Sequence, residues 1–367
     1  MTGWRVVTIG KCCKVIAGQS PESLFYNKDG KGLPFYQGKK DFGDMFVSPP
    51  KVWTEQVTKI AEADDVLMSV RAPVGPVNIA TNSICIGRGL AAIRPSNEIY
   101  RNYLYYFFKC IEPTLTGTAG AVFPSINKAQ IEEIQIPLPP LAIQKAIVAK
   151  LDVAFASIDT AIAAAEKNAE NAKQLFQSYL SDVFEKGGEG WEEKSLPTIA
   201  KVSTGKWDAN HAKEAGAYRF YTCASKYVYS DTKRFFGNCL ILPGNGANVG
   251  DVYFYDGEFD AYQRTYVISD ITINPHFLYH HMSCFWSIRN KDKQFGSATN
   301  FIKIGNFHDY TVNFPEVNTQ QEIVAKISSL NSYYEAMRDN LEKRLKNYSQ
   351  LKQSLLQQAF SGQLVDA

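Results

Sequence analysis

"PPLAIQKAIVAKL" (139–151) and "PEVNTQQEIVAKI" (315–327) begin two copies of one long stretch. Adding 176 to a residue number in the first copy gives its partner in the second, without a gap from Pro139 to Phe184. A repeat of this length indicates that one structural unit occurs twice, so it decides the fold. The identical pairs include Gln144/Gln320, Lys150/Lys326, Glu166/Glu342, Asn171/Asn347, Gln174/Gln350 and Leu175/Leu351.

Both copies predict a long helix. Each copy opens with proline, and beyond Pro140 and Pro315 no proline or glycine follows until Gly187 and Gly362. Apolar residues recur at steps of four and three, which is the seam of a coiled coil, and we place Leu175 and Leu351 on it. A polar residue interrupts both seams at the same place, Asn168 in one and Arg344 in the other.

The two seams differ in size, because one is rich in alanine and the other in bulky residues. Small side chains facing large ones fill a seam without strain, so we expect the helices to pack antiparallel. The entry and exit points predict a register in which Leu141 lies beside Ser361.

The composition limits the class of protein. A length of 367 residues fits two or three domains, and no apolar run is long enough to span a membrane. Seven cysteines without a C-x-x-C pair, and no signal sequence at the start, predict reduced thiols and a cytoplasmic protein. A net charge of +2 excludes a basic, nonspecific nucleic-acid coat, so any contact with DNA must come from local loops or be shared with partners.

Two regions rich in valine, isoleucine, tyrosine and phenylalanine precede the helices. The sequence therefore predicts an α+β fold, with mixed, mainly β domains at 1–138 and 188–314. Long antiparallel coiled-coil helices follow them at 139–187 and 315–367, in a duplication with circular, pseudo-twofold symmetry. The expected elements of the first domain are strands at 14–17, 66–70, 77–80 and 90–93 and a buried helix at 102–109.

The two β-rich regions are themselves related. "WRVVTIGKCCKVIAG" (4–18) matches "WEEKSLPTIAKVSTG" (191–205), and "VLMSVRAPVG" (66–75) matches "LILPGNGANVG" (240–250). "PFY" (34–36) parallels "RFY" (219–221). The framework is shared and the loops differ, so the two reading surfaces are expected to differ.

This order of domains resembles the specificity subunit of type I restriction–modification systems. "IPLPPLAIQKAIVAKL" (136–151) and "LLQQAFSGQLV" (355–365) resemble the conserved regions of that family, and the likeness covers the whole chain. It implies a non-catalytic subunit whose two target recognition domains read an asymmetric, bipartite DNA target. It also implies docking of two methyltransferase subunits and, in the full complex, of restriction subunits. S-adenosylmethionine, ATP and Mg are then expected only in the partner subunits.

The candidates for contact with DNA are polar or basic loop residues beside the paired framework motifs. Arginine pairs with guanine and asparagine with adenine through two hydrogen bonds, whereas lysine mostly meets phosphate. For any single candidate a solvated surface residue is an equal alternative. The first half contributes Lys39, Lys40, Ser69, Arg71, Arg88 and the loop from Thr118 to Ser125, and the second half contributes Lys206, Lys226, Asn245, Asn248, Arg264 and the loop from Ser297 to Lys303.

Two other classes of function compete with this interpretation. A self-contained methyltransferase or nuclease needs a site, but "SPPK" (48–51) lacks the residues that clamp a flipped base. "GNGANVG" (244–250) precedes a strand rather than a phosphate-binding helix, and His280–His281 have no second ligand cluster, so packing is their expected role. A coiled-coil scaffold would not need two aromatic, loop-rich domains. Affinity of the isolated chain for S-adenosylmethionine would favour a self-contained enzyme. Failure to bind DNA even with methyltransferase present would favour a coiled-coil scaffold.

Overall fold

The repeated stretch forms two long helices, α4 (Leu141–Lys186) and α8 (Val317–Ser361). Each is about 68 Å long at 1.5 Å per residue. The structure is a computed structural model that describes residues 4–115, 125–291, 294–295 and 300–364. The chain divides into unit 1 (residues 1–165 and 342–367) and unit 2 (residues 166–341), so each unit combines one β-rich region with one end of each long helix. The two predicted long helices are confirmed, and each begins two residues after the predicted proline.

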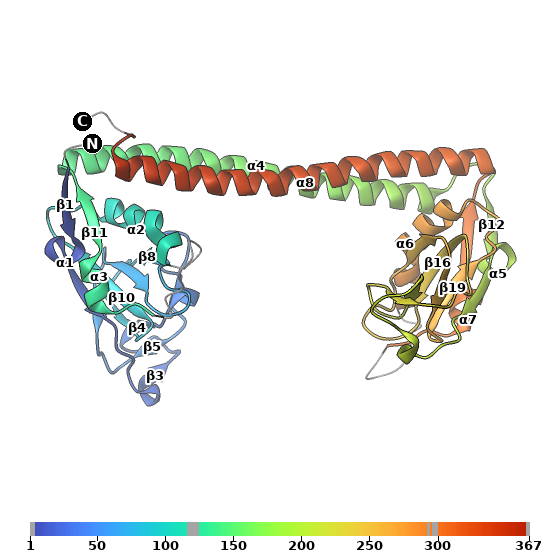
Figure 1. Ribbon diagram of the computed structural model, residues 1–367, viewed down its shortest axis with the longest axis horizontal. Coiled ribbons are helices and arrows are strands. Elements are labelled where there is room, and N and C mark those ends of the chain that lie inside the picture. Colours follow the sequence, from blue (N-terminus) through green and yellow to red (C-terminus); the bar gives the residue numbers. More distant parts are fainter. Residues whose placement is uncertain (1–3, 116–124, 292–293, 296–299, 365–367) are drawn as a thin grey trace. The chain divides into compact units, whose positions relative to one another are not determined.

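Unit 1 is built on a four-stranded sheet in the order β2-β10-β7-β8, with β1 paired to β11 and five short strands in the order β3-β5-β4-β9-β6. In Figure 1, α2 lies between this sheet and the long helices. The predicted strands and the buried helix are all present. The elements are β1 (Arg5–Thr8), α1 (Ile9–Cys12), β2 (Cys13–Ala17), η1 (Ser23–Phe25), β3 (Tyr26–Asn27), β4 (Leu33–Tyr36), η2 (Lys39–Asp41), β5 (Trp53–Thr54), β6 (Ile60–Ala61), β7 (Val66–Ser69), β8 (Val77–Ile79), β9 (Ile84–Ile86), β10 (Leu90–Pro95), α2 (Arg101–Leu115), α3 (Lys128–Glu133) and β11 (Gln135–Leu138).

Unit 2 repeats this architecture, except that its second sheet has three strands in the order β15-β14-β18 in place of five. Its four-stranded sheet has the order β13-β19-β16-β17, β12 pairs with β20, and α6 takes the place of α2 (Figure 1). The predicted internal duplication is therefore confirmed. The elements are β12 (Glu192–Ser195), α5 (Leu196–Ile199), β13 (Lys201–Thr204), η3 (Ala209–His211), β14 (Tyr218–Tyr221), β15 (Val228–Ser230), β16 (Asn238–Pro243), β17 (Tyr253–Asp256), β18 (Phe259–Ala261), β19 (Thr265–Ser269), α6 (Pro275–Asn290), α7 (Ile304–His308) and β20 (Thr311–Phe314).

The long helices are antiparallel within unit 1. Near the start of α4, Lys150 Nζ donates to the carbonyl of Leu364, just beyond the end of α8 (2.8 Å). Further along α4, Asp159 pairs with Lys352, which lies earlier in α8 (2.5 Å). Residue numbers therefore rise along one helix while they fall along the other.

The same direction holds in unit 2, where α4 ends and α8 begins. The rings of Phe176 and Tyr334 are stacked with centroids 6.4 Å apart, and Lys326 Nζ lies 5.0 Å from the ring of Tyr179. The predicted antiparallel packing is thus present in each unit.

The register of this packing differs from the predicted one. The contacts displace α8 along α4 by roughly two turns from the register that places Leu141 beside Ser361. The helix α8 ends as predicted, where Gly362 adopts a left-handed conformation (φ 78°), but its end lies further along α4 than expected. The tail after it, through Leu364, packs on the core of unit 1 and contacts the first turns of α4 instead.

The seam also differs from the predicted one in the last third of each helix. The side chains of Leu175 and Leu351, both predicted to lie on the seam, are 65% and 45% exposed. The next residue makes the interhelical contact in each case, Phe176 with Tyr334 and Lys352 with Asp159. An ideal helix drifts about 20° per heptad from a strict 3.5-residue repeat, and this drift brings the following residue onto the seam.

A buried glutamine in the first turn of α4 binds that helix to the β-rich region before it. The Gln144 side chain is fully buried and accepts a hydrogen bond from the backbone N–H of Tyr100 (2.8 Å). Its amide nitrogen donates to the carbonyls of Glu98 (2.9 Å) and Pro139 (2.8 Å). One side chain therefore satisfies three backbone groups at the helix entry.

Its repeat partner does the same in unit 2. Gln320 is 1% exposed, accepts from the backbone N–H of Asn274 (2.8 Å) and donates to the carbonyl of Pro315 (2.7 Å). The identity of this pair in the sequence therefore has a structural cause.

The two described ends of the chain both lie in unit 1. Trp4 precedes β1 and Leu364 follows α8, and both pack against the same hydrophobic core, which lies between the four-stranded sheet, α2 and the long helices. Among the residues that the structure describes, no helix is long and apolar enough to cross a membrane.

Candidate nucleic-acid interface

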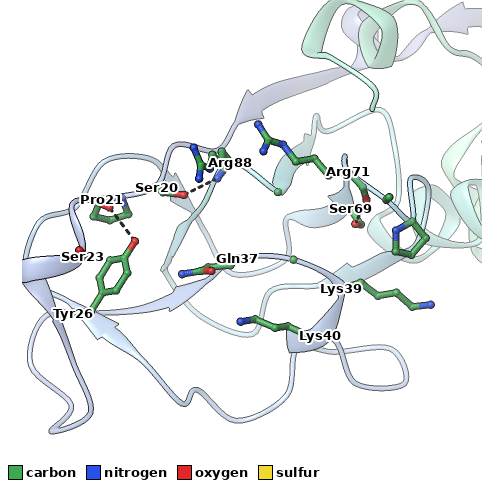
Figure 2. Close-up of a pocket in the computed structure, with 14 residues that line it drawn as sticks. Ser20, Pro21, Ser23, Tyr26, Gln37, Lys39, Lys40, Ser69, Arg71 and Arg88 are labelled. Atoms are coloured by element: carbon green, nitrogen blue, oxygen red, sulfur yellow. Dashed lines mark hydrogen bonds between the residues drawn. The ribbon is translucent and has the colours of Figure 1, made fainter. Parts of the chain in front are cut away.

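A cavity of about 950 Å³ in unit 1 brings together five of the predicted DNA-contact residues, Lys39, Lys40, Ser69, Arg71 and Arg88. Figure 2 shows the two arginines along one side of the hollow and the two lysines along the other. These residues are up to 49 positions apart in the sequence, so the fold gathers them.

Three chain segments supply these side chains. Ser69 ends β7, and Arg71 follows in the loop that leads to β8. Arg88 lies in the turn between β9 and β10, and its backbone N–H donates to the hydroxyl of Ser20 (3.2 Å). The two lysines lie in η2, which two residues separate from the end of β4. All three segments are loops or turns at strand ends, where side chains are free to vary without disturbing the sheet.

The cavity is strongly basic. Within the described residues, no ion pair or side-chain hydrogen bond is made by the charged groups of Lys39, Lys40, Arg71 or Arg88. Arg94 provides a contrast, because its guanidinium binds the buried carboxylate of Asp65 through two bonds of 2.9 Å and so supports the sheet. Four unpaired cations around one hollow favour an anionic ligand of the size of a nucleic-acid backbone.

The sequence interpretation missed several residues of this cavity. Gln37, Tyr26, Ser20 and Ser23 also line it (Figure 2). Burial raises the pKa of Tyr26, and the charge of Arg88 opposes that rise, which reflects how near the two groups lie. Gln37 directly follows the repeated "PFY" motif, so its place beside a framework motif was a signal that could have found it.

A second hollow of about 680 Å³ shares Arg71 and Arg88 with the first. It is lined also by Ser125, another predicted residue, and by Lys128 at the start of α3. Thr118 lies outside the described residues. The basic surface of unit 1 therefore extends from η2 to α3.

The predicted residues of unit 2 are more scattered. The side chains of Lys206, Lys226 and Arg264 are exposed, and they lie on three separate segments of the chain. The amide of Asn248 donates to the carbonyl of Cys223 (2.8 Å) and so holds its own loop.

Two further candidates in unit 2, Lys303 and Ser297, lie near the gap in the described chain. Lys303 Nζ lies 4.2 Å from the ring of Phe295, a cation–π contact at the start of α7. Ser297 lies outside the described residues.

Both units nevertheless hold their loops with one backbone framework. In unit 1, the N–H of Val70 donates to the carbonyl of Gly89 (3.0 Å), and its carbonyl accepts from Ile126 (3.1 Å). Arg71 then forms an antiparallel bridge with Ser125.

The same three pairings recur in unit 2. The N–H of Gly244 donates to the carbonyl of Arg264 (2.9 Å), and its carbonyl accepts from Ile302 (3.0 Å). Asn245 then forms an antiparallel bridge with Phe301. The loops of the two units are therefore anchored at equivalent points.

A repeated glycine completes this framework. A Cβ atom on Gly18 would lie 2.2 Å from the carbonyl oxygen of Gly87, and one on Gly205 would lie 1.7 Å from that of Ala261. Neither position has room for a side chain. The glycine shared by the two sequence matches thus marks a close approach of backbones.

A family model described as the type I restriction modification DNA specificity domain matches residues 1–169 and 188–347. The chain belongs to this family. The two matched segments correspond to the two halves of the duplication, so each half carries one specificity domain. The resemblance noted in the sequence is confirmed.

Similar proteins carry the same description. The MjaX specificity subunit of Methanocaldococcus jannaschii, itself an inferred type I restriction enzyme subunit, is 47% identical over 152 residues, or 40% of this chain. The type I restriction enzyme EcoDI specificity subunit of Escherichia coli is 34% identical over 179 residues, or 47% of this chain. The matched segments span only 36% and 38% of the lengths of those two relatives.

Two solved structures of the family share the fold over nearly the whole chain. The crystal structure of the HsdS subunit from Thermoanaerobacter tengcongensis has a TM-score of 0.65 at 17% identity, covering 99% of this chain and 98% of that one. A chain from a study of complex assembly and conformational transition of the type I R-M system has a TM-score of 0.80 at 16% identity, covering 99% of both. The predicted fold class is therefore confirmed.

The histidine pair of α6 belongs to the packing of its specificity domain. His281 is buried, and its Nδ1 lies 3.0 Å from the hydroxyl of Tyr310. Burial lowers the pKa of His281 to about 3 and that of His280 to about 4. Among the described residues there is no cluster of three or more histidine, cysteine or acidic side chains that could hold a metal ion.

Proposed function

We propose that this chain reads a split DNA target as the specificity subunit of a type I restriction–modification complex. The observation that carries the proposal is the pair of matching loop frameworks, one of which surrounds a basic cavity. The framework is repeated while the polar side chains on it differ, as a protein with two different half-sites requires. Each unit then reads one half-site, and the two half-sites differ in sequence.

The charge of the chain argues for partners. Residues 1–140 contain 15 lysines and arginines against 12 acidic residues, and residues 190–315 contain 13 against 12. Tight binding of a duplex normally neutralises several phosphates, which is more than these small excesses supply. We therefore propose that two methyltransferase subunits, and restriction subunits in the full complex, close around the DNA.

The surfaces of the long helices support this docking. Large apolar side chains stand exposed on both helices, with Val153 70% exposed on α4 and Tyr333 62% exposed on α8. Glu166 and Glu342, identical in the repeat, are exposed as well. Such paired positions give each of the two methyltransferase subunits an equivalent docking site. S-adenosylmethionine, ATP and Mg belong to the partner subunits in this proposal, and the chain itself holds no cofactor and catalyses no step.

The decisive experiment maps methylated bases in DNA from cells that express this chain with its methyltransferase subunit. We expect methylation at one asymmetric target, with two half-sites whose centres are about one helical turn, roughly 10 bp, apart. Omission of this chain should abolish the methylation. Methylation without the chain, or at a single undivided site, would contradict the proposal.

The role of the long helices is tested by lengthening both. Seven residues inserted between Ala165 and Glu166 and between Leu341 and Glu342 add about 10 Å while keeping the helical faces nearly aligned. The spacer of the mapped target should widen by about three base pairs, at 3.4 Å per step, with unchanged half-sites. An unchanged spacer would show that the helices do not set the distance.

Charge reversal at Glu166 or Glu342 tests these two docking sites. The Glu166→Lys variant should bind one methyltransferase subunit where the parent chain binds two, and Glu342→Lys should behave alike. The mass of the purified complex reports the count. Retention of two subunits by both variants would place the docking surface elsewhere.

A further inference from the structure

We infer that the two units read different purines at equivalent positions of their half-sites. Unit 1 reads guanine through Arg71 and Arg88, and unit 2 reads adenine through Asn245 and Gln263. The inference rests on the proposed function, because it requires that both units contact DNA bases. It adds the chemical identity of the bases read.

The first pair of positions is equivalent by backbone geometry. Arg71 and Asn245 each follow the residue whose N–H and carbonyl are both bound in the framework, Val70 in one unit and Gly244 in the other. Each then forms an antiparallel bridge to the segment that enters the next helix. The two side chains therefore leave the backbone from the same point of the fold.

The second pair is fixed in the same way. Arg88 and Gln263 each precede the residue whose carbonyl accepts the framework hydrogen bond, Gly89 in unit 1 and Arg264 in unit 2. On the other side, Gly87 donates to the carbonyl of Tyr36, and Tyr262 donates to that of Tyr221 (2.8 and 2.9 Å). Hydrogen bonds on both flanks hold each turn in the same register.

These side chains are available to a ligand. Arg71, Arg88 and Gln263 are exposed and Asn245 is half-buried. In the described part of the chain, none of the four makes a hydrogen bond or ion pair through its side chain. Asn248, whose amide is bound to the carbonyl of Cys223, is excluded by the same criterion.

The side-chain chemistry assigns the bases. A guanidinium offers two donors, which match the two acceptors O6 and N7 of guanine in the major groove. The amides of asparagine and glutamine offer one donor and one acceptor, which match N7 and N6 of adenine. At both pairs of equivalent positions unit 1 has an arginine and unit 2 has an amide. Unit 1 therefore reads guanine where unit 2 reads adenine.

The test uses the full chain in complex with its methyltransferase subunits, and duplexes that carry the mapped target with each base pair replaced in turn. The wild-type complex should prefer guanine at one position of the first half-site by roughly 10- to 100-fold. Arg71→Asn should transfer that preference to adenine, and Asn245→Arg should transfer the matching adenine of the second half-site to guanine. Arg71→Lys keeps the charge but loses the fork of donors, so it should lower the preference without changing the salt dependence of binding.

Lys40→Asn is the matched control in the same cavity. It should weaken binding to all duplexes equally and lower the salt slope by about one, as loss of a phosphate contact does. If Arg71→Asn behaves like this control, Arg71 contacts phosphate and the inference is overturned. If the wild-type complex methylates no split target, the proposed function fails first. If it does, and all variants keep the base preferences, only this inference fails.

Discussion

At the scale of single residues, one buried amide joins each long helix to its β-rich region. Gln144 and Gln320 bind backbone groups on both sides of the helix entry, and their burial leaves water no access to those groups. Removal of such a side chain leaves the backbone groups unsatisfied, which costs more than the hydrogen bonds themselves contribute.

We therefore expect Gln144→Leu to lower the free energy of unfolding of unit 1 by about 2–4 kcal/mol, because one N–H and two carbonyls lose their partner. Gln174→Leu is the matched control, since Gln174 lies exposed in the same helix and its side chain donates to Glu170 of the same helix (3.1 Å). That change should stay within about 0.5 kcal/mol. Urea denaturation measures both. Equal effects of the two substitutions would contradict the structural role of Gln144.

A second prediction concerns the acid sensitivity of unit 2. Burial holds the pKa of His281 at about 3, against about 6.5 in the unfolded chain. Below pH 6.5 the His281 imidazole is protonated in the unfolded state, whereas in the folded state it stays neutral down to about pH 3. The free energy of unfolding therefore falls as the pH drops from 6.5, by up to about 1.4 kcal/mol per pH unit from this residue.

The variant His281→Phe should remove this share of the pH dependence. It should also lower stability at every pH by about 1–3 kcal/mol, because the hydroxyl of Tyr310 loses its buried partner. Thermal melting at pH 7.5 and pH 5.0 distinguishes the two effects. An unchanged difference between the two pH values would show that His281 is not the titrating group.

The sequence identified part of the candidate site because the framework motifs point to their neighbours. Ser69 and Arg71 lie within a motif repeated in both halves, and they do line one cavity with Arg88 and the two predicted lysines. Tyr26 and Ser20 could not be predicted, since they reach the cavity only through the pairing of short strands distant in sequence. Asn248 looked equivalent to a base-reading residue, but its amide holds a carbonyl of its own domain.

At the scale of elements, the packing of the long helices rests on residues that the heptad count only partly identifies. Leu356 is buried in the core of unit 1, whereas Leu351, which the count places on the seam, is 45% exposed. Periodicity predicts that two helices pair, but a drift of 20° per heptad decides which of two neighbouring residues makes the contact.

The variants Leu356→Ala and Leu351→Ala discriminate between the predicted and observed seams. The first should lower the free energy of unfolding by about 2–5 kcal/mol, since it leaves a cavity in the core of unit 1. The second should cost about 0.5 kcal/mol or less. Chemical denaturation of both variants provides the measurement, and a larger loss for Leu351→Ala would restore the predicted seam.

The strands were predictable where the chain reads as short apolar runs, and β2, β7, β8 and β10 appear as expected. The order of these strands in the sheet could not be predicted, because strand pairing depends on contacts between distant parts of the chain. The parallel pairing of β4 with β9, and of β14 with β18, is of this kind. Local patterns contain no information on such partners.

At the scale of the whole molecule, the duplication makes the chain circular in its connections. Trp4 and Leu364 pack against one core, although 360 positions separate them. The predicted circular arrangement requires both ends to lie in the same unit, and the described ends do. The linker at 187–190 connects α4 to β12 and contributes no helix or strand of its own.

We predict that a permuted chain, opened in this linker and joined from Ala367 to Met1, still folds and directs methylation with its partners. The new junction follows two described residues, Trp4 and Leu364, that pack against the same core, and the new ends leave from a loop. A chain opened in the middle of α6 is the control and should fail to fold, because buried residues of that helix, among them Trp286, belong to the core of unit 2. Circular dichroism and methylation of the mapped target provide the readouts. Loss of folding in the linker permutant would show that the covalent order of the two halves matters.

The contribution of α8 to the core of unit 1 determines the order in which the protein is completed during synthesis. Leu356 and Ala359 belong to that core, and Leu364 packs against it. A ribosome adds roughly 5–20 residues per second, so the first β-rich region waits many seconds for these side chains. Unit 2 (residues 166–341) has all its residues before the last of these side chains is made. The region that leaves the ribosome first is thus the last to gain its complete core, and during that interval the nascent chain exposes the apolar surfaces of α2 and α4 that the end of α8 later covers.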